Sequence, residues 1–332
     1  MSSRTATRAP RGPHHPTSEI TSVVKAISKV GRFGAGLALV ALPAFAQPTQ
    51  PVQLTQLVML GTGTPNADPD RSGPAVAVVR NGKSYLVDAG PGVVRRAAAA
   101  ARTLDLTALT PRNLRVLFLT HLHSDHTLGL PDVIFTSWVL ERDVPLELYG
   151  PPGTKAMVDH LLAAYNEDIR NRLDGLEPAN ENGYKVNVHE ITAPGVLFDD
   201  GNVKVRAFAV PHGDWAASYG YRFDSADRSI VISGDTRASD AVVTACNGCD
   251  LLVHEVISAD GLRTRTPEWQ RYHARAHTST EELGPLANRA APKLLVLYHQ
   301  LYSGTDDASL LAELARAGLT RPVLSARDLT IY

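Results

Sequence analysis

The sequence lacks several features that would place it in a specialised class of protein. Only two of its 332 residues are cysteines, which excludes a small fold built on disulfides. It has no run of 18 apolar residues, so it predicts no membrane-spanning helix. Aromatic residues are few, at 6%, but 44% of the residues are hydrophobic and 20% are charged. This composition excludes a disordered chain and fits a globular protein with a sizeable core.

The first 46 residues have the pattern of a secretory signal peptide behind a basic leader. Basic residues precede an apolar run over 33–43, and the small residues Ala44 and Ala46 follow at the −3 and −1 positions of a cleavage site. The alternative is a tail with a chance apolar segment. We predict cleavage after Ala46, a periplasmic or secreted location, and a mature domain over 47–332.

The net charge is acidic once the leader is set aside. It is −1 for the whole chain and −6 without residues 1–46, which carry six basic residues and one acidic residue. An acidic protein has no general electrostatic attraction for nucleic acid. Composition therefore argues against a nucleic-acid partner.

The two cysteines, Cys246 and Cys249, are separated only by Asn-Gly. A zinc site would need further soft ligands, and the chain has no other cysteine. A disulfide and a pair of buried thiols remain the alternatives.

Strand-like and helix-like runs alternate along residues 52–332. The alternation predicts one domain with two sheets packed face to face and helices outside, because no linker divides the chain. Strands are expected at 52–60, 75–80, 84–88, 114–119, 184–191, 203–210, 218–223, 229–233, 251–256, 294–298 and 329–332, and helices at 91–101, 128–140, 155–173 and 310–317.

The strongest chemical signal is Thr-His-Leu-His-Ser-Asp-His at 120–126, directly after the apolar run 114–119. Three imidazoles and a carboxylate so close together are costly in a core and unusual on a surface. On a loop after a strand they can converge on cations, for which histidine nitrogens and carboxylate oxygens are ordinary ligands.

Three further donors follow other predicted strands. His212, Asp235 and His299 each come just after an apolar run. A single residue of this kind is more often structural, but the repeated placement predicts a shared site. A binuclear metal centre needs about this number of donors.

These motifs resemble the metallo-β-lactamase superfamily over nearly all of residues 52–332. The sequence His-x-His-x-Asp-His at 121–126 matches its metal loop, and Asp88 in Leu-Val-Asp-Ala-Gly matches its supporting aspartate. The resemblance implies an α/β fold, the αβ/βα four-layer sandwich, and two Zn²⁺ ions. By the same resemblance one ion is held by His121, His123 and His212, the other by Asp125, His126 and His299, and Asp235 bridges them.

Within the superfamily the pattern is similar to the branch of ribonuclease Z and the zinc arylsulfatases. The features shared with that branch are Ser-Gly-Asp-Thr-Arg at 233–237, His-Glu at 254–255 and Ala-His-Thr-Ser-Thr at 276–280. The stretch 61–74 looks like the arylsulfatase and phosphodiesterase side. Residues 141–200, where ribonuclease Z carries its tRNA-gripping arm, hold five basic and twelve acidic residues. Such a surface repels a phosphate backbone.

The sequence therefore predicts an exported binuclear zinc hydrolase that cleaves sulfate or phosphate esters with a metal-bridging hydroxide. A tRNA 3′-end endonuclease of ribonuclease Z type is one alternative, and a lactonase or thioesterase is another. Asp125 is expected to assist the nucleophile. His277, before a capping-box pattern, is the expected leaving-group acid, with His254 and Glu255 behind it.

Several properties stay open at this stage. The donor set also suits manganese or iron. The expected partner is a small anionic ester, but the sequence does not choose between sulfate and phosphate. It does not determine the oligomeric state either, and a homodimer is one of the options.

Overall fold

The computed structural model describes residues 54–332. The predicted leader and its cleavage site after Ala46 lie outside the described residues. Among the helices of the described part, none is long and apolar enough to cross a membrane.

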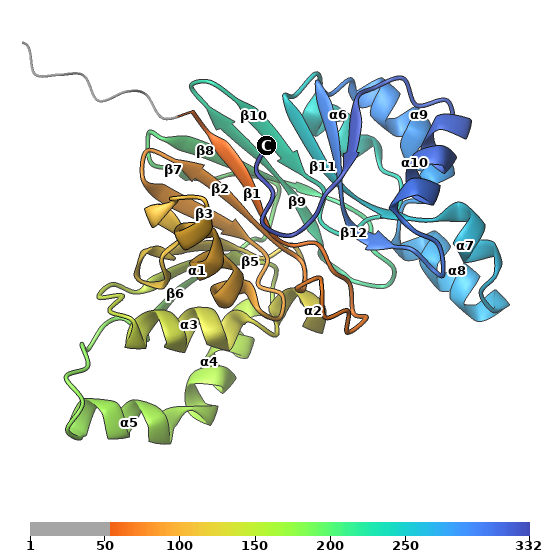
Figure 1. Cartoon of the computed structure of the whole chain (residues 1–332). Helices are drawn as coiled ribbons and strands as arrows, with labels where there is room; N and C mark the ends of the chain where they lie inside the picture. Colours follow the sequence, from red (N-terminus) through yellow and green to blue (C-terminus); the bar gives the residue numbers. More distant parts are fainter. Residues whose placement is uncertain (1–53) are drawn as a thin grey trace, which may run out of the picture. The chain divides into compact units, whose positions relative to one another are not determined.

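The first sheet contains six strands in sequence order (Figure 1). The first three strands pair antiparallel and the last three continue in parallel. Its strands are β1 (Gln56–Gly61), β2 (Ala75–Arg80), β3 (Lys83–Val87), β4 (Val116–Phe118), β5 (Leu146–Gly150) and β6 (Val186–Glu190). The Asn81-Gly82 turn joins β2 to β3, as expected for a tight hairpin.

The second sheet contains seven strands in the order β13-β12-β11-β10-β9-β8-β7. Strands β10 to β13 are parallel and β7 to β10 are antiparallel. The bounds are β7 (Gly195–Asp199), β8 (Val203–Ala209), β9 (Tyr219–Ser225), β10 (Ser229–Ile232), β11 (Leu251–Ile257), β12 (Leu294–Leu301) and β13 (Val323–Ser325).

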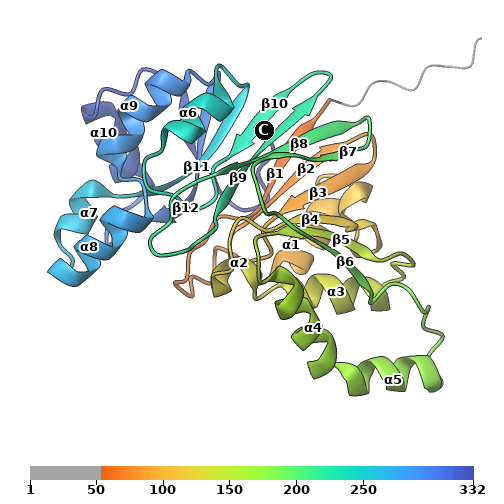
Figure 2. The ribbon, with the colours of Figure 1, turned by 180° about the vertical axis from the view of Figure 1, so that it is seen from behind.

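Helices cover the outer face of each sheet (Figures 1 and 2). On the first sheet lie α1 (Val93–Thr103), α3 (Leu130–Val139) and α4 (Thr154–Ala164), and on the second lie α6 (Asp240–Cys246), α9 (Thr280–Ala290) and α10 (Asp307–Arg316). The remaining helices are α2 (Ser124–Thr127), α5 (Asn166–Asp174), α7 (Ala259–Arg263) and α8 (Pro267–Ala276), with 3₁₀ turns at Thr107–Leu109 and Pro111–Asn113.

Successive side chains of a strand point to opposite faces of its sheet and so pack into different layers. In β1, Leu57 and Met59 pack between the two sheets, whereas Val58 and Leu60 pack under the helices. Strands buried on both faces read as continuous apolar runs, which is why the sequence identified them. The structure confirms the predicted αβ/βα four-layer sandwich.

Two predicted elements differ from the structure. The helix expected over 155–173 is two helices that meet at Tyr165, whose ring packs at a tilt against Phe135 with centroids 4.4 Å apart. The strand expected over 329–332 makes only a short antiparallel pairing with β1, through Leu57 and Tyr332. The regular edge strand there is β13, which the sequence analysis missed.

The cysteine alternatives are resolved by the structure. Cys246, at the end of α6, and Cys249 form a disulfide. Both residues are buried in the cluster beneath α6 and α9.

Candidate metal centre

Loops at the carboxyl ends of five strands bring the predicted site residues together. Asp88 follows β3, and the 120–126 loop follows β4. His212 and Asp235 follow β8 and β10, and His299 lies near the end of β12. Residues from opposite sheets meet because both sheets present these ends at the same edge of the sandwich. This position is where open α/β sheets commonly place their ligands.

Asp88 holds the loop in place from beneath. Its carboxylate accepts hydrogen bonds from the backbone N–H of Thr120 at 2.8 Å, from the Thr120 hydroxyl, and from His126 Nδ1 at 2.8 Å. Burial alone would lower the pKa of His126, but the carboxylates of Asp235 and Asp88 raise it well above its usual value. The surroundings therefore favour positive charge at this point.

One group of donors consists of His121, His123 and His212. The His123 Nδ1 atom lies 3.0 Å from His121 Nε2 and 3.1 Å from His212 Nε2. The other ring nitrogen, Nδ1, is hydrogen-bonded in two of these residues. In His121 its partner is the Thr120 hydroxyl, and in His212 it is the Ala276 carbonyl. Burial lowers the pKa of all three rings, to about 4 for His123. Three imidazoles thus each turn one ring nitrogen toward a common point.

The second group consists of Asp125, His126 and His299. His299 is the extra residue of a β-bulge in β12, because Tyr298 pairs with Glu255 and Gln300 with Val256. Its φ of 46° is left-handed, and the bulge turns its ring toward Asp125, with Nε2 3.2 Å from Oδ2. Bulges commonly re-aim side chains next to functional sites.

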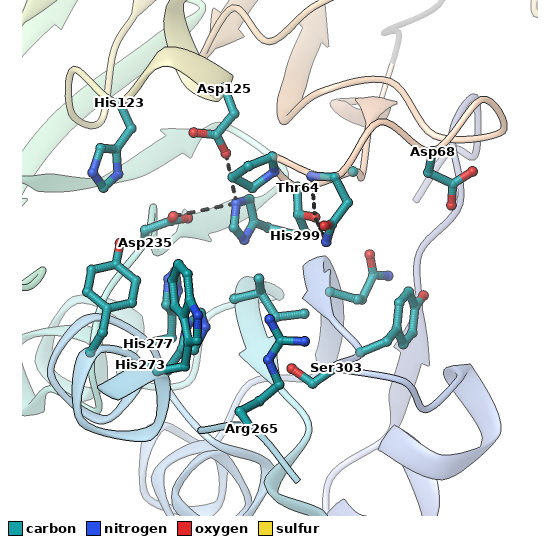
Figure 3. Close-up of a pocket in the computed structure, with 18 of the residues that line it drawn as sticks. Thr64, Asp68, His123, Asp125, Asp235, Arg265, His273, His277, His299 and Ser303 are labelled. Atoms are coloured by element: carbon teal, nitrogen blue, oxygen red, sulfur yellow. Dashed lines mark hydrogen bonds and ion pairs between the residues drawn. The ribbon is translucent and has the colours of Figure 1, made fainter. Parts of the chain in front are cut away.

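Asp235 lies between the two groups. Its Oδ2 atom is 3.9 Å from both His121 Nε2 and His212 Nε2, 3.4 Å from His126 Nε2 and 3.5 Å from His299 Nε2. Figure 3 shows its carboxylate beside His299 and Asp125. The structure thus brings together all seven predicted ligands.

The arrangement of the donor atoms suits the binding of metal ions better than hydrogen bonding among the donors themselves. His126 Nε2 and Asp235 Oδ1 are buried and have no hydrogen-bond partner in the described part of the chain. Such orphaned polar atoms are rare and need a partner. A nitrogen-rich group and a mixed nitrogen–oxygen group, joined by one carboxylate, suit two ions of the zinc type.

Glu255 and His277 lie beside this centre. The buried Glu255 carboxylate accepts hydrogen bonds from the Thr278 backbone N–H at 2.8 Å and from His277 Nδ1 at 3.3 Å. The His277 ring stacks on His299 with centroids 5.8 Å apart. His254, the preceding residue of β11, points to the other face of the sheet, and among residues 54–332 its ring hydrogen-bonds only the Glu255 carbonyl. Glu255, but not His254, therefore contacts His277.

A cavity of about 970 Å³ opens from the centre. Asp125, Asp235 and His299 line one end of it (Figure 3). Helix α8 forms another wall, with Trp269 and Tyr272. This wall was not predicted from the sequence, although Thr-Pro-Glu at 266–268 is a helix-start pattern and the two aromatic residues follow at helical spacing.

Comparisons with known proteins agree with this geometry. A family model described as the beta-lactamase superfamily domain matches residues 83–300, which include all seven donors. Ribonuclease Z from Mycobacterium sp. (strain KMS) is 38% identical over 245 residues, 73% of this chain and 83% of that protein. The metallo-beta-lactamase fold protein YhfI from Bacillus subtilis is similar in structure, with a TM-score of 0.64 and 17% identity over 84% of this chain and 100% of that one. Human tRNase Z, short form, has a TM-score of 0.60 and 24% identity over 83% and 98%.

Proposed function

Because this chain belongs to the beta-lactamase superfamily, in the branch that contains ribonuclease Z, we propose that it is a two-zinc hydrolase of phosphate diesters. The observation that carries the proposal is the convergence of seven nitrogen and oxygen donors beside a cavity large enough for a small ester. Sulfate esters present a similar oxyanion, so a sulfate ester has to be tested beside the diester.

The chain's own residues would orient the substrate and manage protons. Zinc ions held by the seven donors would supply Lewis acidity to the ester and lower the pKa of water toward neutrality. Asp125 is almost buried and faces the cavity, where its carboxylate can accept a hydrogen bond from the attacking water.

His277 is placed to serve the leaving group. Its Nδ1 hydrogen-bonds the Glu255 carboxyl group, which fixes the ring where it lines the cavity. Burial lowers the pKa of His277 to about 4, so the free protein holds it neutral at pH 7. A bound anionic ester would raise this pKa, because an adjacent negative charge favours the imidazolium. We propose that His277 becomes a proton donor only in the complex with substrate.

Cleavage of precursor tRNA at its 3′ end is the second candidate. The 38% identity to a ribonuclease Z supports it. The charge of the chain argues the other way. Helix α5 projects away from the sheets (Figures 1 and 2), and most of the twelve acidic residues over 141–200 are exposed there and around it. A small diester is therefore the first candidate.

A substrate panel with metal analysis tests the proposal. We expect zinc-loaded protein to hydrolyse bis-p-nitrophenyl phosphate, and Asp235→Ala to lose one ion and nearly all activity. The control is Asp240→Ala, at an exposed position, which should keep both ions and its activity. Turnover of precursor tRNA alone would make the second candidate correct. Turnover of p-nitrophenyl sulfate or a lactone, without the diester, would contradict both. Metal analysis of native protein also decides among zinc, manganese and iron.

We further propose that the protein is exported and that its leader is cleaved after Ala46. The order of basic, apolar and small residues supports this location. The Cys246–Cys249 disulfide is consistent with an oxidising compartment. Sequencing the N-terminus of protein from the producing cell tests it, and protein that retains residues 33–43 in the cytoplasm would contradict it.

A further inference from the structure

Helix α10, which packs beside α9 on the outer face of the second sheet (Figures 1 and 2), buries a carboxylate on its core face. Its buried residues are Leu310, Glu313 and Leu314, at the spacing that normally places apolar side chains against a core. Glu313 is only 3% exposed, and among residues 54–332 its hydrogen-bond partners are three neutral donors. A buried charge without a counter-ion is costly. The residue therefore calls for an explanation other than packing.

The three hydrogen bonds reach the Glu313 carboxylate from two segments of the chain. The Ser258 hydroxyl donates to Oε1 at 2.7 Å, and the Ala259 backbone N–H donates to Oε2 at 2.8 Å. The Thr280 hydroxyl also donates to Oε2, and it accepts a hydrogen bond from the Ala259 N–H at 3.1 Å. Glu313 thus links the residues that follow β11 to the start of α9.

Both linked segments carry residues of the proposed catalytic site. Glu255 lies on β11 just before the first segment, and His277 lies three residues before Thr280. The segments also pair directly with each other. The Ile257 N–H donates to the Thr278 carbonyl at 2.9 Å, and the Thr278 N–H donates to the Glu255 carboxylate at 2.8 Å. The place of His277 beside Glu255 therefore depends on how these two segments are held.

A third segment joins the same junction. The Ser258 N–H donates to the carbonyl of Leu301, which lies two residues after His299 on β12. Glu313 itself does not line the cavity. Three segments that carry site residues thus meet at a carboxylate that reaches them from outside the cavity.

From these contacts we infer that Glu313 is a positioning residue, which holds His277 against Glu255 and beside the metal centre without touching the substrate. The inference rests on the proposed function for the role of His277. It adds that helix α10 sets the precision of that role. Precision matters because a displacement of about 1 Å, caused far from the chemistry, can lower a rate about 100-fold.

Two substitutions break the link at different points. Thr280→Val removes one hydroxyl with little change of shape, and it carries the test if Glu313→Ala, which removes all three hydrogen bonds, does not fold. Glu313→Gln is the rescue variant, because its amide oxygen can replace Oε2, which accepts two of the three bonds. The matched control is Glu282→Gln, since Glu282 is exposed, lies at the start of the same helix and hydrogen-bonds Ser279.

Rates with two diesters distinguish positioning from a general loss of stability. Diphenyl phosphate releases a more basic phenolate than bis-p-nitrophenyl phosphate and so depends more on a proton donor. We expect Thr280→Val and Glu313→Ala to lower kcat for diphenyl phosphate by about 10- to 100-fold. The loss for bis-p-nitrophenyl phosphate should be smaller, and KM and the content of two zinc ions should not change. Glu313→Gln should recover most of the rate, and Glu282→Gln should keep all of it.

Combination with His277→Ala completes this test. If Glu313 acts through His277, neither Thr280→Val nor Glu313→Ala should cause a further loss in that background. A further loss there, or equal losses for the two diesters, would show that Glu313 supports only the fold and would overturn the inference.

Hydrogen exchange of backbone amides, followed by mass spectrometry, tests the link without turnover. Peptides that cover 257–259 and 277–280 should exchange faster in Glu313→Ala and Thr280→Val by about 5-fold or more, as the loss of one buried hydrogen bond implies. Peptides that cover 120–126 should be unchanged. Native exchange at both segments in both variants would also overturn the inference. If the native chain hydrolyses neither diester, the proposed function is contradicted, and hydrogen exchange alone decides whether Glu313 holds these segments.

Discussion

At the scale of single residues, Asp88 combines an uncommon backbone with three buried hydrogen bonds. Its φ of 62° is left-handed, a region that aspartate enters more readily than most residues. Three donors, from Thr120 and His126, converge on its carboxylate. The residue thus fixes both the start of the metal loop and the direction of the His126 ring.

Removing this carboxylate should weaken both folding and metal binding. In Asp88→Ala three buried donors lose their acceptor, which should lower the free energy of unfolding by about 3–5 kcal/mol. Loss of the His126 partner should weaken zinc binding by about 10- to 100-fold. Urea denaturation and competition with a chelator measure the two effects. Exposed Asp159→Ala should change neither, and normal zinc affinity in Asp88→Ala would contradict the supporting role.

Trp215 offers a second test at the residue scale. Its indole N–H donates to His123 Nε2 at 2.8 Å, while His123 Nδ1 faces His121 and His212. A metal on Nδ1 requires the hydrogen of the neutral ring to sit on Nε2, where it would oppose the indole N–H. Trp215 should therefore move when zinc binds.

Tryptophan fluorescence reports this movement directly. Zinc added to metal-free protein should change the emission, and Trp215→Phe should lose most of that change while it still binds zinc. The two remaining tryptophans, Trp138 and Trp269, provide the unchanged signal. An identical response in Trp215→Phe would show that the indole stays in place.

The sequence predicts the metal ligands better than the cavity wall. Each ligand follows an apolar strand. Because the carboxyl ends of parallel strands lie at the same edge of a sheet, the residues that follow them lie close together. Nothing local marks Trp269 or Arg265 as pocket residues, because their role depends on where α8 packs. The bulge at His299 also depends on its partner strand β11, so its left-handed backbone has no local signal.

At the scale of elements, one buried arginine joins α3 to the loop before β6. Arg142 is fully buried and has no carboxylate partner in the described residues. Its guanidinium makes five hydrogen bonds, all to the backbone carbonyls of Leu114, Val133, Ile134 and Gly183. It thus satisfies carbonyls of α3 and of two loops.

Arg142→Met should destabilise the fold without touching the metal centre. Methionine retains part of the volume but removes all five of these buried hydrogen bonds, so we expect a loss of about 3–5 kcal/mol in the free energy of unfolding. Chemical denaturation measures it. The nearby exposed Arg115→Met should cost far less, since Arg115 forms an exposed ion pair with Asp143 at the surface. Equal losses in the two variants would contradict this role.

Burial explains much of which strands the sequence predicts, although β5, with three buried residues, was not predicted. Strands β2 and β11 are buried along their whole length and read as apolar runs. Strand β7 has no buried residue, and β13 has none either, so neither shows a pattern that the sequence analysis could detect. Their pairing is set by the neighbouring strands β8 and β12.

At the scale of the whole molecule, the order of strands depends on contacts between distant segments. Asp227, in the turn between β9 and β10, receives hydrogen bonds from the backbone and hydroxyl of Thr55, which precedes β1, and contacts Arg80 at the end of β2. These contacts tie the first sheet to the second. No pattern in the sequence marks them, because the partners are 172 and 147 residues apart along the chain.

Acid should therefore weaken the junction between the sheets. Burial alone would raise the pKa of Asp227, but hydrogen bonds from Thr55 and Ser225, together with Arg80, lower it to about 2. A carboxylate with a lowered pKa in the folded state stabilises the fold above its unfolded pKa near 4, and this contribution is lost as the pH falls toward 2. Since the group is partly exposed and screened, we expect it to contribute only about 1 kcal/mol to the free energy of unfolding.

Urea denaturation of metal-free protein at pH 7 and pH 3 tests this contribution. The difference in the free energy of unfolding between the two pH values should be smaller in Asp227→Asn than in the native chain. Metal-free protein is used so that loss of zinc ligation does not contribute, and an unchanged difference would show that Asp227 does not govern the acid response.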